Sequence, residues 1–247
     1  MSRRRRVSML LIFAAMIAAT LAGCKPESLV STSQEVDIGR QSAQQVERQY
    51  PVNRDPELNR LVNTMGQNLA ACSPRQDVEY TFKILDIKEI NAVSLPGGWI
   101  YVYRGLIDQT RNNPDQLAGV IAHEIGHVAA RHHADMIGRE TYAGIIVQTI
   151  GGGDIQQWAN IFANLTLLRW SRKNEYDADE LGLDIMYKCR QYNPQGLVNF
   201  FNLLQERQGR DLSDFEQMFS THPVTSERMK RAQQHLDDLN AGREQPR

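Results

Sequence analysis

Apolar residues recur every three or four positions in the first part of the chain, as is typical of helices that bury one face. Two such segments predict helices: 35–50 and 56–69. Three later segments are rich in β-branched and aromatic residues and predict strands: 80–85, 91–95 and 99–103. Pro96-Gly97-Gly98 predicts a turn between the last two. Because the later segments again have helical spacing, the predicted fold class is α+β, mainly helical with a small β-sheet.

A clear helix start precedes the most informative part of the chain. Asn113 is a favourable N-cap, Pro114 suits the first helical position, and Asp115 places an acid in the first turn. Apolar residues of the next four turns share one face. His123 and His127 lie only about 40° apart on another face. The two imidazoles are therefore expected to project together from a helix whose other side is buried.

These two histidines belong to an H-E-x-x-H sequence and predict a zinc site. Two imidazoles one turn apart can bind one zinc ion, and Glu124 between them can act as a base toward the attacking water. A catalytic zinc ion needs a third protein ligand and an open position. Glu175 is the candidate third ligand. Asp179, one turn later, is expected to accept the outward N–H of a ligating histidine.

Two more histidines follow the motif directly. His132 and His133 are expected to lie along the same helix, too close to the motif to supply the third ligand. We expect them to form its exposed, cationic C-terminal end, where positive charge suits the helix dipole.

The N-terminus has the layout of a secretory signal peptide. A block of arginines precedes an apolar run that is short for a membrane span, although a simple transmembrane anchor is the alternative. Leu21-Ala22-Gly23-Cys24 resembles a bacterial lipobox, which implies cleavage before Cys24 and acylation of its sulfur. Lys25 favours the outer membrane. The expected organisation is a signal peptide, a lipidated tether, one domain and a polar tail: 1–23, 24–34, 35–240 and 241–247.

Composition narrows the function classes. The chain has 247 residues, 41% of them hydrophobic, and a formal net charge of −1. This charge, with no basic stripe outside the N-terminus, argues against a nucleic-acid-binding protein. If Cys24 carries lipid, Cys72 and Cys189 remain in an oxidising compartment. They form either a disulfide or two buried thiols.

The motif and its surroundings resemble a known family. The H-E-x-x-H sequence, Glu175-x-x-x-Asp179 and the upstream Asn91-Ala92 are similar to the zinc endopeptidase family that contains the CAAX prenyl endopeptidases and the heat-shock protease HtpX. The similarity runs from about residue 35 to 232. It implies a zincin-type metallopeptidase domain that holds one Zn²⁺ through His123, His127 and Glu175, with Glu124 as the base.

The resemblance also implies a place and a substrate class. Since no long apolar span follows the signal, the chain resembles not the polytopic members of the family but its periplasmic quality-control members. These would be anchored in the outer membrane by lipid, face the periplasm and cleave unfolded or misfolded envelope proteins. The strand that contains Asn91, Ala92 and Val93 is a candidate edge for pairing with an extended substrate. An ordinary core strand is the alternative.

A late segment adds two candidate catalytic residues. His222-Pro223 followed by Arg228 resembles a pairing that the family keeps after its glutamate helix. Either side chain could stabilise the oxyanion of the tetrahedral intermediate. His222 could instead occupy the open zinc position and hold the enzyme latent. In the simplest alternative, His222 is exposed and Arg228 pairs with Glu227 or another acid.

Two rival functions use the same residues. Peptide deformylases also have H-E-x-x-H, but they need a cysteine ligand in a glycine-rich setting, which the sequence around Cys72 does not offer. A non-catalytic holdase or outer-membrane assembly factor could retain zinc for structure. Such a site closes all four positions with protein ligands, and His222 could be the fourth.

Overall fold

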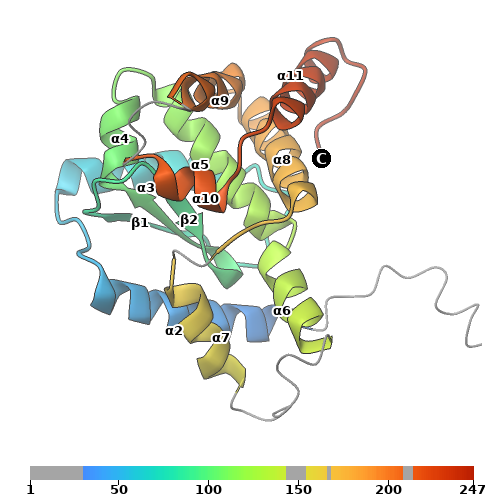
Figure 1. Cartoon of the computed structure of the whole chain (residues 1–247). Coiled ribbons are helices and arrows are strands. Elements are labelled where there is room, and N and C mark those ends of the chain that lie inside the picture. Colours follow the sequence, from blue (N-terminus) through green and yellow to red (C-terminus); the bar gives the residue numbers. More distant parts are fainter. Residues whose placement is uncertain (1–29, 143–153, 166–167, 208–213) are drawn as a thin grey trace, which may run out of the picture.

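A three-stranded sheet lies between two groups of helices in the computed structural model (Figure 1), which describes residues 30–142, 154–165, 168–207 and 214–247. The strands are β1 (Thr81–Leu85), β2 (Ala92–Ser94) and β3 (Trp99–Tyr103), with the 3-10 turn η1 (Pro96–Gly98) between the last two. The helices are α2 (Thr32–Gln49), α3 (Pro56–Ala70), α4 (Arg104–Thr110), α5 (Pro114–Ala129), α6 (His132–Tyr142), α7 (Asp154–Ala163), α8 (Arg172–Cys189), α9 (Gln195–Arg207), α10 (Glu216–Thr221) and α11 (Ser226–Asn240). The prediction of a mainly helical α+β fold is confirmed.

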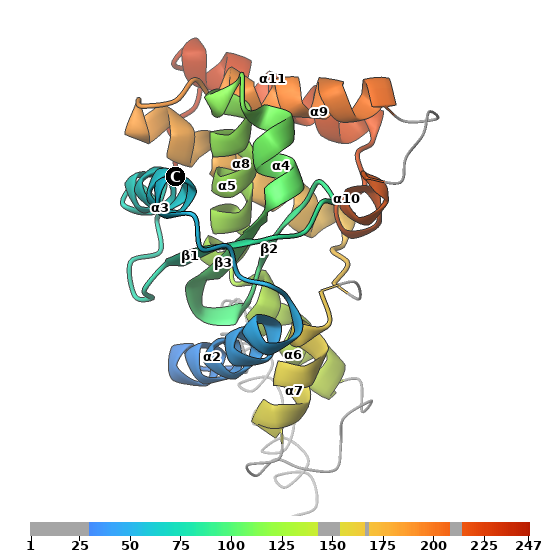
Figure 2. The same ribbon diagram turned by 90° about the vertical axis from the view of Figure 1, so that its left-hand side faces the viewer.

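The sheet divides the core because neighbouring residues of a strand point to opposite faces. In β3, Ile100 and Val102 pack in a cluster with residues of α3 and α5, whereas Tyr101 and Tyr103 pack in a cluster with residues of α2 and α7. Figure 2 shows α2 and α7 on one side of the sheet and α5 and α8 on the other. The strand order is β1-β3-β2, with β1 parallel and β2 antiparallel to β3. Thus β2, which lies beside α5, is an edge strand.

Two glycines let α5 and α8 pack almost backbone to backbone. A Cβ atom on Gly126 would lie 2.6 Å from the carbonyl oxygen of Ala178, and one on Gly182 would lie 3.0 Å from the backbone nitrogen of His123. Larger side chains would push the helices apart. The residues that α5 and α8 carry are therefore held at short range.

The start of α5 follows the sequence prediction, but its end does not. Asn113 accepts a hydrogen bond from the backbone N–H of Gln116, and Pro114 occupies the first turn. The helix stops at Ala129, where Arg131 adopts a left-handed conformation with φ 58°. This residue interrupts the helix, so that His132 begins the separate helix α6.

The expected exposed, cationic end formed by His132 and His133 was therefore wrong. Both side chains are buried, with exposed fractions of 2% and 0%. Burial lowers the pKa of His133 to about 4, so this imidazole is neutral at physiological pH. The left-handed Arg131 is the reason, because an uninterrupted helix would have carried the two rings onward.

The structure contains a Cys72–Cys189 disulfide, with a Cα–Cα distance of 5.8 Å. Cys72 follows the end of α3 and Cys189 ends α8, so the bond ties these two helices together. Among the described residues, no helix combines the length and the apolar composition needed to cross a bilayer. The predicted signal peptide and Cys24 lie outside the described residues.

Removing the disulfide should destabilise the domain. The bond closes a loop over a sequence separation of 117 residues, and in the chain-entropy model such a loop contributes about 4–5 kcal/mol to the free energy of unfolding. Urea denaturation of the Cys72→Ser/Cys189→Ser double variant should show a loss of this order. Two alkylatable thiols in the native, unreduced wild type would contradict the bond.

Candidate metal centre

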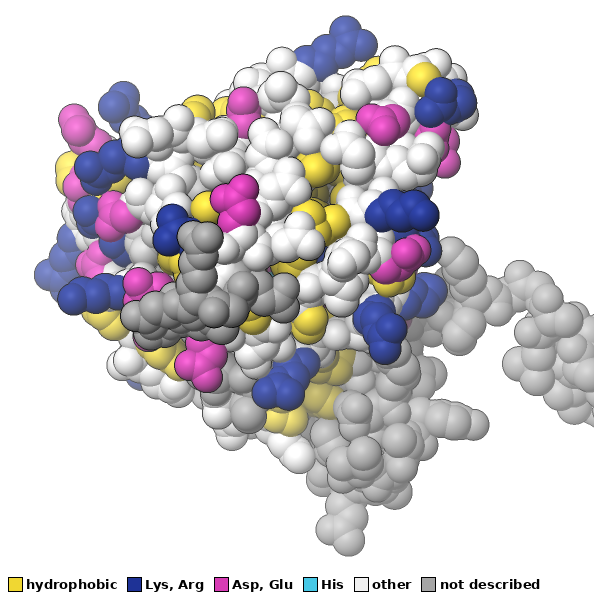
Figure 3. All heavy atoms as spheres, turned by 45° about the horizontal axis from the view of Figure 1, so that its top comes forward, with side chains coloured by type: hydrophobic (Ala, Val, Ile, Leu, Met, Phe, Trp, Pro, Cys, Tyr) yellow, Lys and Arg dark blue, Asp and Glu magenta, His cyan; other side chains and the backbone are white. Residues whose placement is uncertain are grey.

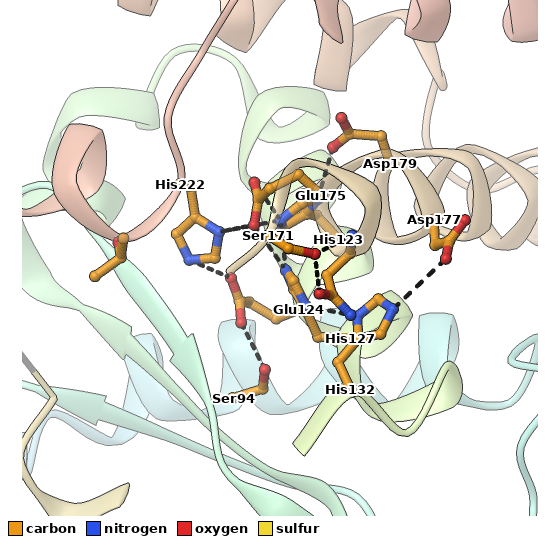
Figure 4. A network of polar contacts seen from close by, with 12 residues as sticks. Ser94, His123, Glu124, His127, His132, Ser171, Glu175, Asp177, Asp179 and His222 are labelled. Atoms are coloured by element: carbon orange, nitrogen blue, oxygen red, sulfur yellow. Dashed lines mark hydrogen bonds and ion pairs between the residues drawn. The ribbon is translucent and has the colours of Figure 1, made fainter. Parts of the chain in front are cut away.

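Three side chains from α5 and α8 converge at one buried point (Figure 4). His123 and His127 come from α5, and their Nε2 atoms lie 3.1 Å apart. Glu175 comes from the first turn of α8, with its Oε1 3.3 Å from His127 Nε2. The structure thus brings together the three residues that the sequence proposed as metal ligands.

His222 is the fourth member of this group. It follows α10, is buried, and places its Nδ1 3.3 Å from His123 Nε2 and 3.1 Å from Glu175 Oε1. Each of the four residues offers one ligand atom, and these atoms all lie within 4.8 Å of one another. The alternative of an exposed His222 is excluded.

The donor set fits a zinc ion. Zinc in proteins is tetrahedral and takes imidazole and carboxylate ligands with bonds of about 2.0–2.2 Å, which places the donor atoms about 3.3–3.6 Å apart. The closest donor separations in the cluster are 3.1 to 3.3 Å. Burial lowers the pKa of His127 well below its usual range, so this ring is neutral, as a metal ligand must be.

Glu175 is held in its charged form. Burial alone would raise the pKa of its carboxyl, but the positive charge of Arg228 and the contact with His222 outweigh burial and hold the pKa well below its usual range. For His222 burial alone would lower the pKa, and the carboxylates of Glu175 and Glu124 outweigh it and raise the value. The surroundings thus favour a negative Glu175 beside a positive His222, which would have to release its proton to bind a metal ion.

Asp179 and Arg228 form hydrogen bonds and ion pairs that hold two of the candidate ligands, His123 and Glu175, in place. The Oδ1 of Asp179 lies 2.8 Å from His123 Nδ1, as expected for a carboxylate that fixes a ligating histidine. Arg228 donates to both carboxylate oxygens of Asp179, at 2.6 and 2.8 Å, and also pairs with Glu175. Its guanidinium stacks over the ring of Phe201. These contacts agree with the alternative in which Arg228 pairs with an acid, and its suggested role as a donor to an oxyanion stays a prediction.

Glu124 has two partners that direct its carboxylate. The hydroxyl of Ser94 donates to Oε2 at 2.8 Å, and His222 Nε2 lies 3.4 Å from Oε1. Ser94 belongs to β2, so its side chain reaches Glu124 only because this edge strand lies beside α5. This contact could not be predicted from local sequence, since 30 residues separate the two positions.

The proposed substrate strand shows one unusual feature. Ala92, Val93 and Ser94 are buried, and the carbonyl of Ser94 accepts a hydrogen bond from His133 Nε2 at 2.8 Å. Asn91 uses its Oδ1 to accept from the N–H of Ala92, but its buried Nδ2 has no partner among the described residues. A buried amide donor without a partner is costly and is available to a ligand.

An apolar pocket adjoins the cluster. It is lined by His123, Glu124 and His222 together with apolar side chains from α5, α9 and the segment around α10, among them Val120, Leu197, Phe200, Phe201 and Met218. On the face shown in Figure 3, positive and negative side chains are interspersed, and no histidine side chain is visible among the described residues. The centre is thus an interior site with an apolar wall.

Two side chains beside His127 were missed by the sequence analysis. The indole of Trp170 stacks on the imidazole of His127, with 4.6 Å between ring centroids. His132 Nδ1 lies 2.9 Å from His127 Nδ1. Five residues along an unbroken helix would place His132 about 140° away from His127, so only the end of α5 brings it back.

Comparison with known proteins agrees with this geometry. The model of "Peptidase family M48" matches residues 53–236. The chain is 26% identical to the beta-barrel assembly-enhancing protease of Yersinia pestis over 231 residues, which cover 88% of this chain and 47% of that protein. It is 28% identical to the metalloprotease LoiP of Escherichia coli (strain K12), covering 92% and 95%, and 27% identical to the metalloprotease YcaL of that strain, covering 90% and 82%. The chain spans about half the length of the assembly-enhancing relatives.

Alanine in place of His123, His127 or Glu175 should remove most of the bound metal, because these three must hold the ion when His222 is displaced, and a catalytic zinc ion needs three protein ligands. The zinc content, measured by metal analysis of the purified protein, should fall from about one ion per chain to a small fraction of that value. Glu124→Gln should retain the metal, and Glu180→Ala on the same α8 helix is the matched control. Full zinc occupancy in the Glu175→Ala variant would show that Glu175 is not a metal ligand.

Proposed function

The chain belongs to peptidase family M48, and from this membership we propose that it is a zinc-dependent endopeptidase of the bacterial envelope that cleaves unfolded or misassembled proteins. The observation that carries the proposal is the convergence of His123, His127, Glu175 and His222 with Glu124 at their side. The resemblance drawn from the H-E-x-x-H sequence holds at the level of this family.

His123, His127 and Glu175 would hold the zinc ion. When bound, zinc supplies Lewis-acid polarisation of the scissile carbonyl and favours ionisation of water near neutral pH. Glu124 then takes the proton of the attacking water and later delivers it to the leaving amine nitrogen. The hydroxyl of Ser94 holds Oε2 of this carboxylate. The other oxygen, Oε1, lies on the side of His222 and is left to accept and donate the proton.

His222 fits the role of a plug better than that of an oxyanion donor. Its Nδ1 points to the same place as the three ligands from the helices, so it would complete the four donors around zinc. A catalytic ion needs one open position. We therefore take the described arrangement as a latent form, from which a substrate displaces His222.

The same observation favours one rival function. A closed set of three histidines and one glutamate also suits a structural zinc ion in a non-catalytic chaperone or outer-membrane assembly factor. The base Glu124, held in place by Ser94 beside the ligands, favours the enzyme.

Substrates are proposed to bind as extended, flexible segments. The edge position of β2 suits pairing through main-chain hydrogen bonds, and the free Nδ2 of Asn91 would gain a partner there. The pocket beside the cluster has a volume of only about 10 Å³, so a hydrophobic side chain would reach the apolar wall with Leu197 and Phe200 once His222 is displaced. Unfolded proteins expose both features. The name of the Yersinia pestis relative, which refers to β-barrel assembly, supports a role in the envelope.

The location is proposed from the N-terminal sequence. The lipobox at Cys24 supports an acylated anchor, and Lys25 after it supports the outer membrane. The Cys72–Cys189 disulfide supports an oxidising compartment such as the periplasm.

Casein cleavage by the purified protein separates the roles of Glu124 and His222. Glu124→Gln should retain zinc and lose about 10²–10⁴-fold in turnover, because it removes the base and no ligand. His222→Ala should retain zinc through the other three ligands and increase turnover or digest itself, because the plug is gone. His235→Ala, which changes another late histidine outside the centre, is the control.

The opposite outcomes are equally informative. Turnover near the wild-type level in Glu124→Gln would contradict the mechanism. A fall in turnover with zinc retained in His222→Ala would make His222 a transition-state donor. A wild type and a His222→Ala variant that both bind zinc and both fail to cleave unfolded proteins would favour the non-catalytic function.

Metabolic labelling with a radioactive fatty acid tests the anchor. The wild type should be labelled and should lack residues 1–23, whereas Cys24→Ala should stay unlabelled because it has no sulfur to acylate. An unlabelled wild type that keeps its arginine-rich N-terminus would indicate a transmembrane anchor.

A further inference from the structure

The two ligand histidines of α5 are supported by different chemistry. His123 turns its Nδ1 to the carboxylate of Asp179, which Arg228 holds in place. His127 turns its Nδ1 to another imidazole, that of His132, at 2.9 Å. His132 is buried, and its ring stands at 70° to that of His127. Nothing in the reaction proposed above uses His132.

The contact between the two Nδ1 atoms determines where the protons lie. One of the two must donate and the other must accept. His127 can bind a metal ion through Nε2 only if that nitrogen carries no proton, so its proton lies on Nδ1. His132 Nδ1 is then the acceptor, and the proton of His132 lies on Nε2. That atom faces Asp177, whose Oδ2 is 3.9 Å away and also pairs with Lys173 at 3.1 Å.

The fold fixes His132 through its preceding residue. Arg131 takes the left-handed conformation that ends α5, and its side chain donates to Glu35 Oε2 at 3.2 Å and to the carbonyl of Val30 at 2.6 Å. Arg75 donates to both oxygens of Glu35 and to the carbonyl of Val128. The turn that carries His132 back to His127 is therefore pinned by a buried ion-pair network at the end of the motif helix.

We propose that His132 is a positioning residue for the metal centre: it accepts the Nδ1–H of His127, holds that ring in the tautomer with a free Nε2, and thereby strengthens metal binding. This inference rests on the proposed metal site. Trp170, stacked on the face of the ring, limits rotation of His127 but cannot select its tautomer. Loss of such an outer partner typically weakens metal affinity about 10- to 100-fold.

Two variants of similar size separate the hydrogen bond from simple packing. His132→Asn keeps an acceptor oxygen near the position of Nδ1, whereas His132→Leu keeps the volume and has no acceptor. Competition with a chelator on the purified full-length protein should give near wild-type zinc affinity for Asn and a fall of about 10- to 100-fold for Leu. His133→Leu is the control, since it removes a neighbouring buried histidine that contacts Ser94 and no ligand.

Nitrogen-15 NMR of the metal-free protein supplies the second measurement. The fraction of His127 rings protonated at Nδ1 should be higher in the wild type and in His132→Asn than in His132→Leu, because without an acceptor at Nδ1 the proton moves to Nε2, which lies 3.3 Å from Glu175 Oε1. Equal affinity in the Asn and Leu variants, or an unchanged tautomer in Leu, would overturn the proposal. An equal fall for His133→Leu would also overturn it, by showing a general packing effect.

The outcomes also separate this inference from the proposed function. If the wild type binds no zinc, the proposed metallopeptidase fails, and the tautomer of His127 in the metal-free protein still decides the role of His132. If His132→Leu does not fold, Asp177→Ala provides the measurement, because it frees the Nε2–H of His132. The Asp177→Ala variant should then shift the tautomers of the His127 and His132 rings, with Lys173→Ala as its control.

Discussion

The close packing of α5 on α8 is the constraint on which the centre depends. Gly126 and Gly182 remove the Cβ atoms that would separate the helices, so the backbone of one touches the other. At this short range a carboxylate from the first turn of α8 reaches imidazoles one turn apart on α5. An increase in the helix separation would lengthen the bonds of any metal bound there, and metal affinity depends steeply on such geometry.

Burial of so many polar groups is possible because each charge has an opposite charge at hand. Arg228 lies between Asp179 and Glu175, and Arg75 lies against Glu35, so that neither buried guanidinium nor the carboxylates are left uncompensated. Removing one member of such a group costs more than the pair contributes, because the partner stays buried and charged. The late segment with Arg228 is therefore joined to the motif helix by electrostatics as well as by packing.

In the proposed function, the same charge compensation would link latency to substrate binding. His222 contacts Glu175 and Glu124 at once, so it occupies a place near both the ligand set and the base. A substrate that displaced it would open the fourth position and free the base in one movement. In the proposed mechanism the apolar wall beside His222 would favour a segment with an exposed hydrophobic side chain.

Local sequence determined the elements and the residues that α5 and α8 contribute. Helical spacing and the Asn113 cap located α5, and the four-residue intervals put His123 beside His127 and Glu175 beside Asp179, because a helix turns by a fixed angle per residue. The convergence of these two helices, the choice of His222 as a buried neighbour and the Cys72–Cys189 bond needed the tertiary structure. The contacts of Ser94 with Glu124 and of His132 with His127 could not be predicted from sequence for the same reason. The first contact crosses from sheet to helix, and the second depends on one left-handed residue whose conformation is stabilised by charges distant in the sequence.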